Sequence, residues 1–293
     1  MKLGPPLAML WRDKFALVAA LILLVIVLCA ILGPWLVGDA AIRMNLRARN
    51  ATPFSFNQGF LFFLGADSLG RSIIARIILA SRTTLAIAGA AVLCSLVVGT
   101  TLGLVAGYKE GPVSTVILRL TDVLMSFPSL LLALVVLYVF APSPINVVWV
   151  LAITRIPIYL RTCRAEVMEI RERMFVTAAR VTGASVWRLV WRHILPMAAP
   201  TLVTIATLDF AFVMLSESSL SFLGLGVQPP DITWGLMVSE GRNYLGSAWW
   251  LSFWPGLAIA ITTMSLNLFA NWVRIVLDPV QRWRLDAKGG SND

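Results

Sequence analysis

Three charged residues lie inside long apolar stretches of the sequence: Arg155, Asp209 and Glu217. A charge at the centre of a bilayer is costly, about 2.5–3.5 kcal/mol for an arginine on insertion scales, so such side chains are candidates for function. Asp209 and Glu217 are eight residues apart, a spacing that sets them about 80° apart around a helix and allows both to face one cavity. The three residues are therefore predicted candidates for lining a pathway through the membrane. Two alternatives stay open: a structural ion pair for Arg155, and a solvated position at the outer interface for Glu217.

The sequence contains few residues that could form a catalytic site. His193 is the only histidine, which excludes an H-E-x-x-H zinc site and a Ser-His-Asp triad built within this chain. No G-x-x-x-x-G-K-[ST] phosphate loop occurs, so we expect no ATP, cofactor or metal to be bound by this chain. Cys29, Cys94 and Cys163 lack C-x-x-C spacing and lie in or at the end of apolar stretches, which indicates packing residues. An intramembrane aspartyl protease needs two deep aspartates, and Asp209 is the only well-centred one, so an enzyme is not predicted.

The composition is that of a membrane protein. Hydrophobic residues make up 58% of the 293 residues and charged residues only 13%, against about 25% charged in soluble domains. The net charge is +9, which raises the question of nucleic-acid binding. However, most of the cations flank apolar blocks, as the positive-inside rule predicts for cytoplasmic loops. We therefore expect contact with membrane lipid and no nucleic acid.

The apolar blocks predict an all-α membrane protein with six transmembrane helices and both termini in the cytoplasm. The six blocks are 15–36, 85–107, a block that ends near 140 after a short inside loop at 108–122, 147–163, 197–225 and 251–273. The first block is about 22 residues long, more than the core of a signal peptide, so we interpret it as a retained helix. In the third block, Pro128 predicts a kink.

The chain is predicted to divide into three parts. An N-terminal helix and an extracytoplasmic segment occupy 1–84, a core of five transmembrane helices occupies 85–279, and a cytoplasmic tail occupies 280–293. Within the core, Gly99, Gly103 and Gly107 share one helix face through their four-residue spacing, which predicts close approach of a neighbouring helix.

Two loops decide the orientation. Segment 37–84 carries six arginines and segment 161–196 carries seven, so placing the second inside puts the first outside, against the positive-inside rule. An interfacial helix with its basic face in water is predicted where the first of these segments meets the second apolar block. Segment 226–250 is also predicted to lie outside.

The most polar interior stretch is 175–196, FVTAARVTGASVWRLVWRHILP. It predicts a short helix, a bend at Gly183 and a second amphipathic helix over 185–193, after which Pro196 begins the fifth apolar block. Small side chains in its first half allow a partner protein to approach the backbone closely. An ordinary basic cytoplasmic loop is an equal alternative on composition alone.

This stretch resembles the EAA loop of ABC importer permeases, in which A-A-x-x-x-G is followed by I-L-P about ten residues later. Thr177 stands where the motif has its glutamate, so no role of that carboxylate is carried over, although the peptide-importer branch often lacks it too. The matching residues are Ala178, Ala179, Gly183, Ile194, Leu195 and Pro196. The resemblance implies a coupling helix that docks into an ATPase subunit. The residues expected to carry that contact are Phe175, Val176, Ala178, Ala179, Arg180, Gly183 and Ala184.

Two more regions resemble the peptide and nickel branch of these permeases. LGADSLGR at 64–71 is similar to a stretch that precedes the second helix in that branch, with Ser72 and Ala75 as departures. ESSLSFLGLGVQPPDITWG, AWWLSFWPGLAI and LNLFANWVRIVLDP are similar to the DppC/OppC signature. The departures there are Ala270, Asn271 and Ile275. Together with the loop, the resemblance covers about residues 60–279.

The resemblance implies a permease subunit with the type I ABC importer fold in a bacterial cell membrane. Its expected cargo is a dipeptide, an oligopeptide or a similar small molecule; glutathione, nickel chelates and haem-like compounds are not distinguished by the sequence. The expected partners are a second homologous permease, two ATPase subunits that use ATP and magnesium, and an extracytoplasmic substrate-binding protein. A self-contained secondary transporter or channel is the alternative, but it calls for inverted repeats, and none is evident beside Pro128 and Pro157.

Overall fold

The computed structural model describes residues 9–11, 13–54, 59–109, 111–140 and 143–277. Five of its helices are long and apolar enough to cross a membrane, and a bent helix pair brings the number to as many as six. The five spans are α2 (Lys14–Ile42), α3 (Ile73–Tyr108), α6 (Pro144–Arg171), α9 (Leu195–Phe222, with the turns before it) and α11 (Trp250–Leu277). The bent pair is α4 (Pro112–Met125) and α5 (Ser129–Val139).

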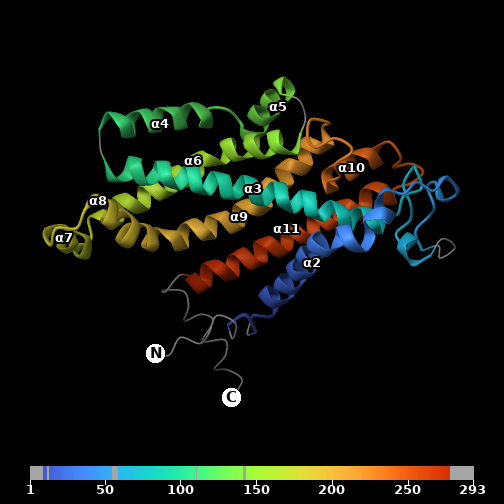
Figure 1. The fold of residues 1–293 in the computed structure, drawn as a ribbon, viewed down its shortest axis with the longest axis horizontal. Coiled ribbons are helices and arrows are strands. Elements are labelled where there is room, and N and C mark those ends of the chain that lie inside the picture. Colours follow the sequence, from blue (N-terminus) through green and yellow to red (C-terminus); the bar gives the residue numbers. More distant parts are fainter. Residues whose placement is uncertain (1–8, 12, 55–58, 110, 141–142, 278–293) are drawn as a thin grey trace, which may run out of the picture.

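Shorter elements lie at the two ends of the bundle. At one end are α7 (Met174–Val181), α8 (Val186–Arg188) and the π-helical turn η3 (Leu189–Ile194). At the other end lie η1 (Leu46–Ala48), η2 (Phe60–Phe62) and α10 (Trp234–Arg242). Figure 1 shows α7 and α8 at the far left and the segment between α2 and α3 at the far right. These two segments are predicted to lie on opposite sides of the membrane, and their positions at opposite ends of the bundle agree with that prediction.

Local sequence signals explain where several helices begin. Asp13, Ser72, Ser143 and Thr233 each precede a helix and accept a hydrogen bond from the backbone N–H three residues later, at 3.2 Å. This satisfies one of the donors that the first helical turn leaves open. Pro144 follows its cap at the first position of α6, where the missing N–H removes no helical bond.

The glycine prediction is confirmed, because α6 packs directly on the backbone of α3. A Cβ atom on Gly99 would lie 2.6 Å from the Cβ of Tyr159, and one on Gly103 would lie 2.7 Å from the Cβ of Cys163. The next glycine of the series, Gly107, meets Val167 in the same way. Close packing of this kind holds helices together in lipid, where burial of apolar surface offers little advantage.

The outer face of the bundle is apolar and exposed, as expected for lipid contact. Helix α2 packs on α3 and α11, and the rest of its surface exposes Leu21, Leu24, Val25 and Leu28. The core lies inside, where Trp234 of α10 is 2% exposed and donates from its indole N–H to the carbonyl of Ile77 at 2.9 Å. Helix α10 is thereby inserted against α3, although its sequence belongs to a segment predicted only as an outside loop.

Several predicted boundaries were wrong. The inside loop at 108–122 is mostly helix α4, and α6 continues through Pro157 to Arg171. Pro128 does mark a break, because α4 and α5 meet there at 87°. Proline disfavours helical backbone in the residue before it, which ends α4 and starts a new helix. The tail at 280–293 lies outside the described residues.

The predicted second amphipathic helix at 185–193 is not a separate element. It runs through η3 into α9, so that 186–222 forms one continuous span. Pro196 and Pro200 lie in the first turns of α9, and a proline ring would clash with the carbonyl four residues earlier in a regular helix. A π-helical turn widens the backbone before Pro196 and lets the helix continue.

We predict that Gly103→Leu destabilises the protein, because its Cβ would meet Cys163 and the carbonyl of Leu160, at 2.7 and 2.8 Å. Overpacking of this kind costs about 1–3 kcal/mol, which a lower unfolding temperature in detergent would reveal. Gly38→Ala is the matched control, because nothing lies within 4 Å of a Cβ added there. Equal unfolding temperatures for the two variants would contradict the packing of α3 on α6.

Candidate functional site

The structure brings together two of the three intramembrane charges. Arg155 of α6 forms an ion pair with Asp209 of α9 through Nη2 and Oδ1. Tyr159, one turn further along α6, donates its hydroxyl to Oδ2 of the same carboxylate at 3.0 Å. The guanidinium also lies over the ring of Phe212, with Cζ 4.2 Å from the ring centroid. The side chains of Arg155 and Asp209 are 17% and 1% exposed, so the pair is largely removed from solvent.

This arrangement joins α6 to α9 at the middle of both helices. A buried pair of opposite charges is tolerated where each charge is neutralised and its remaining hydrogen-bonding groups are satisfied. Asp209 and Arg155 both meet that condition in part. Oδ2 of Asp209 accepts from Tyr159, and Oδ1 lies in the ion pair with Arg155, but Oδ1 and Nε of Arg155 are buried without a hydrogen-bond partner among the described residues.

Glu217 lies elsewhere on α9 and contacts different groups. It is fully buried, and its carboxylate accepts hydrogen bonds from the hydroxyls of Ser221, at 2.8 Å, and Ser218, at 3.4 Å. Ser221 in turn accepts from the backbone N–H of Val227 at 3.2 Å. Glu217 thus fixes the turn after α9, whereas Asp209 faces α6. A role of Arg155, Asp209 or Glu217 in a pathway stays a prediction.

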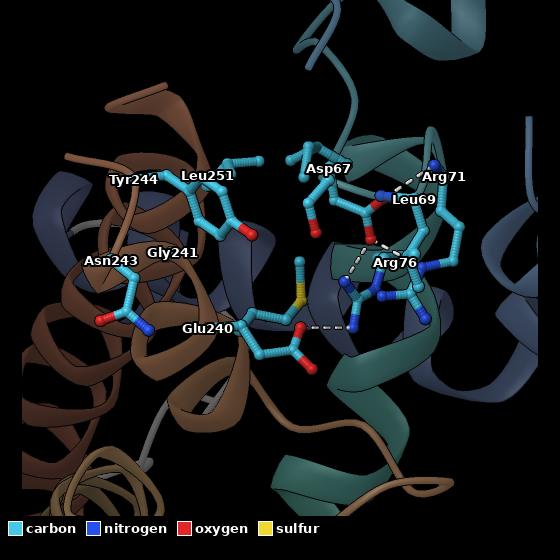
Figure 2. A pocket seen from close by; sticks show the side chains of 12 residues that line it. Asp67, Leu69, Arg71, Arg76, Glu240, Gly241, Asn243, Tyr244 and Leu251 are labelled. Carbon is cyan, nitrogen blue, oxygen red and sulfur yellow. Dashed lines mark hydrogen bonds and ion pairs between the residues drawn. The ribbon is translucent and has the colours of Figure 1, made fainter. Parts of the chain in front are cut away.

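A second group of charges lies at the opposite end from α7 (Figure 2). Oδ2 of Asp67 accepts from Nε of Arg71 and from Nη1 of Arg76, both at 2.6 Å, and Nη2 of Arg76 donates to Glu240 at 2.9 Å. The Arg76 side chain is 3% exposed. The predicted interfacial helix with its basic face in water is therefore wrong for this residue, because two carboxylates draw it into the protein.

The geometry of this cluster accounts for the LGADSLGR stretch. The other oxygen of Asp67 accepts from the backbone N–H groups of Leu69, at 2.9 Å, and Arg71, at 2.8 Å, which folds the segment back on itself as an Asx turn does. Gly70 has a φ of +74° and touches the backbone of Asn45, so no side chain fits there. A cavity of about 330 Å³ separates this turn from α10.

The cluster clamps the segment before α3 onto α10. Sequence reasoning did not find Glu240, because nothing in its local pattern distinguishes it from a solvated acidic residue. The signal in the sequence was Asp67, a single carboxylate followed by Arg71 and Arg76 that could satisfy only part of their donors. The contact with Glu240 joins positions 164 residues apart, which the tertiary fold alone determines.

The residues predicted to contact an ATPase lie on or next to α7. Val176 is completely buried, Ala179 and Ala184 are half-buried, and the other four are exposed, namely Phe175, Ala178, Arg180 and Gly183. The helix ends in a Schellman motif, in which Ala184 N–H bonds to Ala179 C=O and Gly183 N–H to Arg180 C=O, at 3.0 and 3.1 Å. Gly183 supplies the required positive φ of +86°, which confirms the predicted bend.

One face of α7 anchors it and the other is open. Val176 packs with Val167 and Ile170 of α6, with Leu189 and Ile194 of η3 and with Leu104 of α3, in one apolar cluster. On the open face, Met174 and Val181 are 88% and 83% exposed. Apolar side chains this exposed on a short helix at the end of the bundle (Figure 1) are candidates for contact with another protein.

Sequence comparisons give matches along almost the whole chain. Residues 99–283 match the family described as binding-protein-dependent transport system inner membrane component. Residues 7–53 match the N-terminal transmembrane domain of oligopeptide transport permease C.

Several relatives align with this chain over nearly the full length of both proteins. The di/tripeptide transport system permease protein DppC of Pseudomonas aeruginosa is 39% identical over 94% of this chain and 92% of its own length. The probable D,D-dipeptide transport system permease protein DdpC of Escherichia coli is 34% identical over 92% and 89%. The glutathione transport system permease protein GsiD of Pectobacterium atrosepticum is 36% identical over 92% and 88%.

We predict that Arg76→Gln lowers the free energy of unfolding by about 3–5 kcal/mol, the usual effect of removing one partner from a buried ion pair. Asp67 would then retain only one of its two cationic partners. Thermal unfolding in detergent measures the change. Glu240→Gln is the control, and we expect about 1 kcal/mol or less there because its side chain is 37% exposed. Equal effects of the two variants would show that Asp67 does not depend on Arg76.

Proposed function

This chain belongs to the inner membrane components of binding-protein-dependent transport systems, and from this premise we propose that its cargo is a dipeptide or a short oligopeptide. It is an inner membrane permease subunit of an ABC importer, and it works with a substrate-binding protein and an ATPase. It is not itself an enzyme, since ATP hydrolysis in this family belongs to the partner ATPase. The names of its relatives, two dipeptide permeases and one glutathione permease among them, support a peptide cargo. A self-contained secondary transporter is thereby set aside.

The coupling proposal rests on the two faces of α7, one exposed and one buried. Its outer face exposes apolar residues. Its inner face is anchored by Val176, which belongs to an apolar cluster with residues of α3, α6 and α9. An ATPase that docks on Met174, Phe175 and Val181 would therefore push on the ends of α3, α6 and α9 together. We assign to this contact the coupling of ATP-driven closure to movement of the transmembrane helices.

The second permease is proposed to cover α4 and α5. Along α4, Val113, Val116, Leu120 and Val123 are all exposed, and their spacing of three and four residues puts them on one face. A homologous chain packed there would enclose a pathway between the two subunits, each forming half of it. In the same proposal, two ATPase subunits bind ATP and magnesium, one against each permease.

Gly183→Trp tests the coupling contact. No atom lies within 4 Å of a Cβ added at Gly183, so a larger side chain there starts in open space on the side where we propose that the ATPase docks. We expect ATP-driven peptide uptake to fall by about tenfold or more, which corresponds to about 1.4 kcal/mol of lost docking free energy. Uptake into vesicles and co-purification of the ATPase are the measurements.

The control is Gly183→Asn, because asparagine tolerates the positive φ of this position without adding bulk. It separates backbone strain from a steric block. Uptake that stays at the wild-type level with tryptophan would rule out the proposed docking surface. If both variants lose uptake equally, the defect lies in the fold of the turn and the contact is likewise unsupported.

A further inference from the structure

We propose that the cavity beside Arg155 binds the carboxylate of the cargo as it passes through the membrane. This inference rests on the proposed function, because it assigns to a peptide cargo the group that the permease recognises. The cavity has a volume of about 300 Å³ and lies between the α4–α5 break and the middle of α6. Its polar lining consists of Ser129, Thr154, Arg155, Arg161 and Thr162.

The lining of this cavity suits an anion. Two arginines, two threonines and one serine line it, whereas none of its lining residues is acidic. Each of the two arginines has one carboxylate partner outside the lining: Asp209 pairs with Arg155, and Asp122 pairs with Arg161 at 2.6 Å. A cationic group would meet guanidinium groups and hydroxyls but no carboxylate in the lining, so the free amino end of a peptide is disfavoured.

Arg155 retains donors for a further partner. A guanidinium has five N–H donors in a planar fork that matches a carboxylate. Asp209 engages Nη2, and the side chain is 17% exposed, which leaves part of it open to the cavity that it lines. The guanidinium is oriented by the ion pair with Asp209 and by the ring of Phe212, whose centroid lies 4.2 Å from Cζ.

The broken span supplies the space itself. Phe127 at the break and Ser129 at the start of α5 both line the cavity, and a helix turning through 87° leaves room that a straight helix would fill. Non-helical backbone at membrane depth is tolerated where it lines a cavity. In this proposal Asp209 is a positioning residue that holds Arg155 in place, and Arg155 is the residue that contacts cargo.

The test compares a dipeptide with its C-terminal amide, which differs only in lacking the carboxylate charge. The full transporter is reconstituted with its ATPase and binding protein, and each peptide is supplied at a concentration that saturates the binding protein. The uptake ratio of acid to amide is then measured for the wild type and for Arg155→Gln. Because the binding protein is the same in both, its own preference cancels. We expect the ratio to fall by about tenfold or more, the usual loss for a charge-assisted hydrogen bond.

Asp209→Asn tests the positioning role. It removes the charge that orients Arg155, while an amide oxygen can still accept the hydroxyl of Tyr159, so we expect the acid-to-amide ratio to fall, but less than for Arg155→Gln. Arg161→Gln alters a half-exposed pair and is expected to lower the ratio less than Arg155→Gln. If Arg155→Gln does not assemble with its partners, Arg161→Gln decides the question alone, and an unchanged ratio there overturns the proposal.

Two other outcomes are distinguishable. If Arg155→Gln and Asp209→Asn reduce uptake of acid and amide in equal proportion, the pair only supports the fold, and the carboxylate site is overturned while ATP-driven peptide import stands. If the wild type moves neither peptide with ATP and the binding protein present, the proposed peptide cargo fails, and with it this inference.

Discussion

The close approach of α6 to the glycine face of α3 is the constraint on which the rest of the bundle depends. Within lipid, apolar burial gives helices little reason to associate, so contact between backbones has to supply the attraction. Gly99 receives Tyr159 at this contact, and Tyr159 then reaches Asp209 on α9. The placement of the buried ion pair therefore follows from a stripe of residues that have no side chain.

The buried charged side chains follow one rule: most of their polar atoms form a hydrogen bond or an ion pair with another group of the chain. Asp209 has an arginine and a tyrosine, Glu217 has hydroxyl groups, and Asp67 has two arginines and two backbone N–H groups. Unpaired charges would cost far more in a medium that offers no water. The buried Nε atoms of Arg155 and Arg76 depart from this rule, since neither has a hydrogen-bond partner among the described residues, and both arginines line cavities.

The two ends of the molecule differ in how they are held. At the α10 end, ion pairs and an Asx turn fix a long loop against the helices, and Trp234 is inserted between them. At the α7 end, one fully buried valine anchors a short helix whose other apolar residues, except the half-buried Ala179, are exposed. A firmly held outer end and an exposed inner end suit a subunit that receives cargo on one side and force on the other.

The helical membrane class, the positions of most spans and the turn at Gly183 follow from the amino-acid sequence alone. Each depends on neighbours along the chain: runs of apolar residues, glycines four apart, and a positive φ that one residue type readily adopts. The sequence did not determine the helix at 112–125, the continuity of 186–222 or the partners of Arg76, Arg155 and Glu217. Those depend on contacts between distant helices, since a charged side chain is buried or solvated according to what the fold brings opposite it.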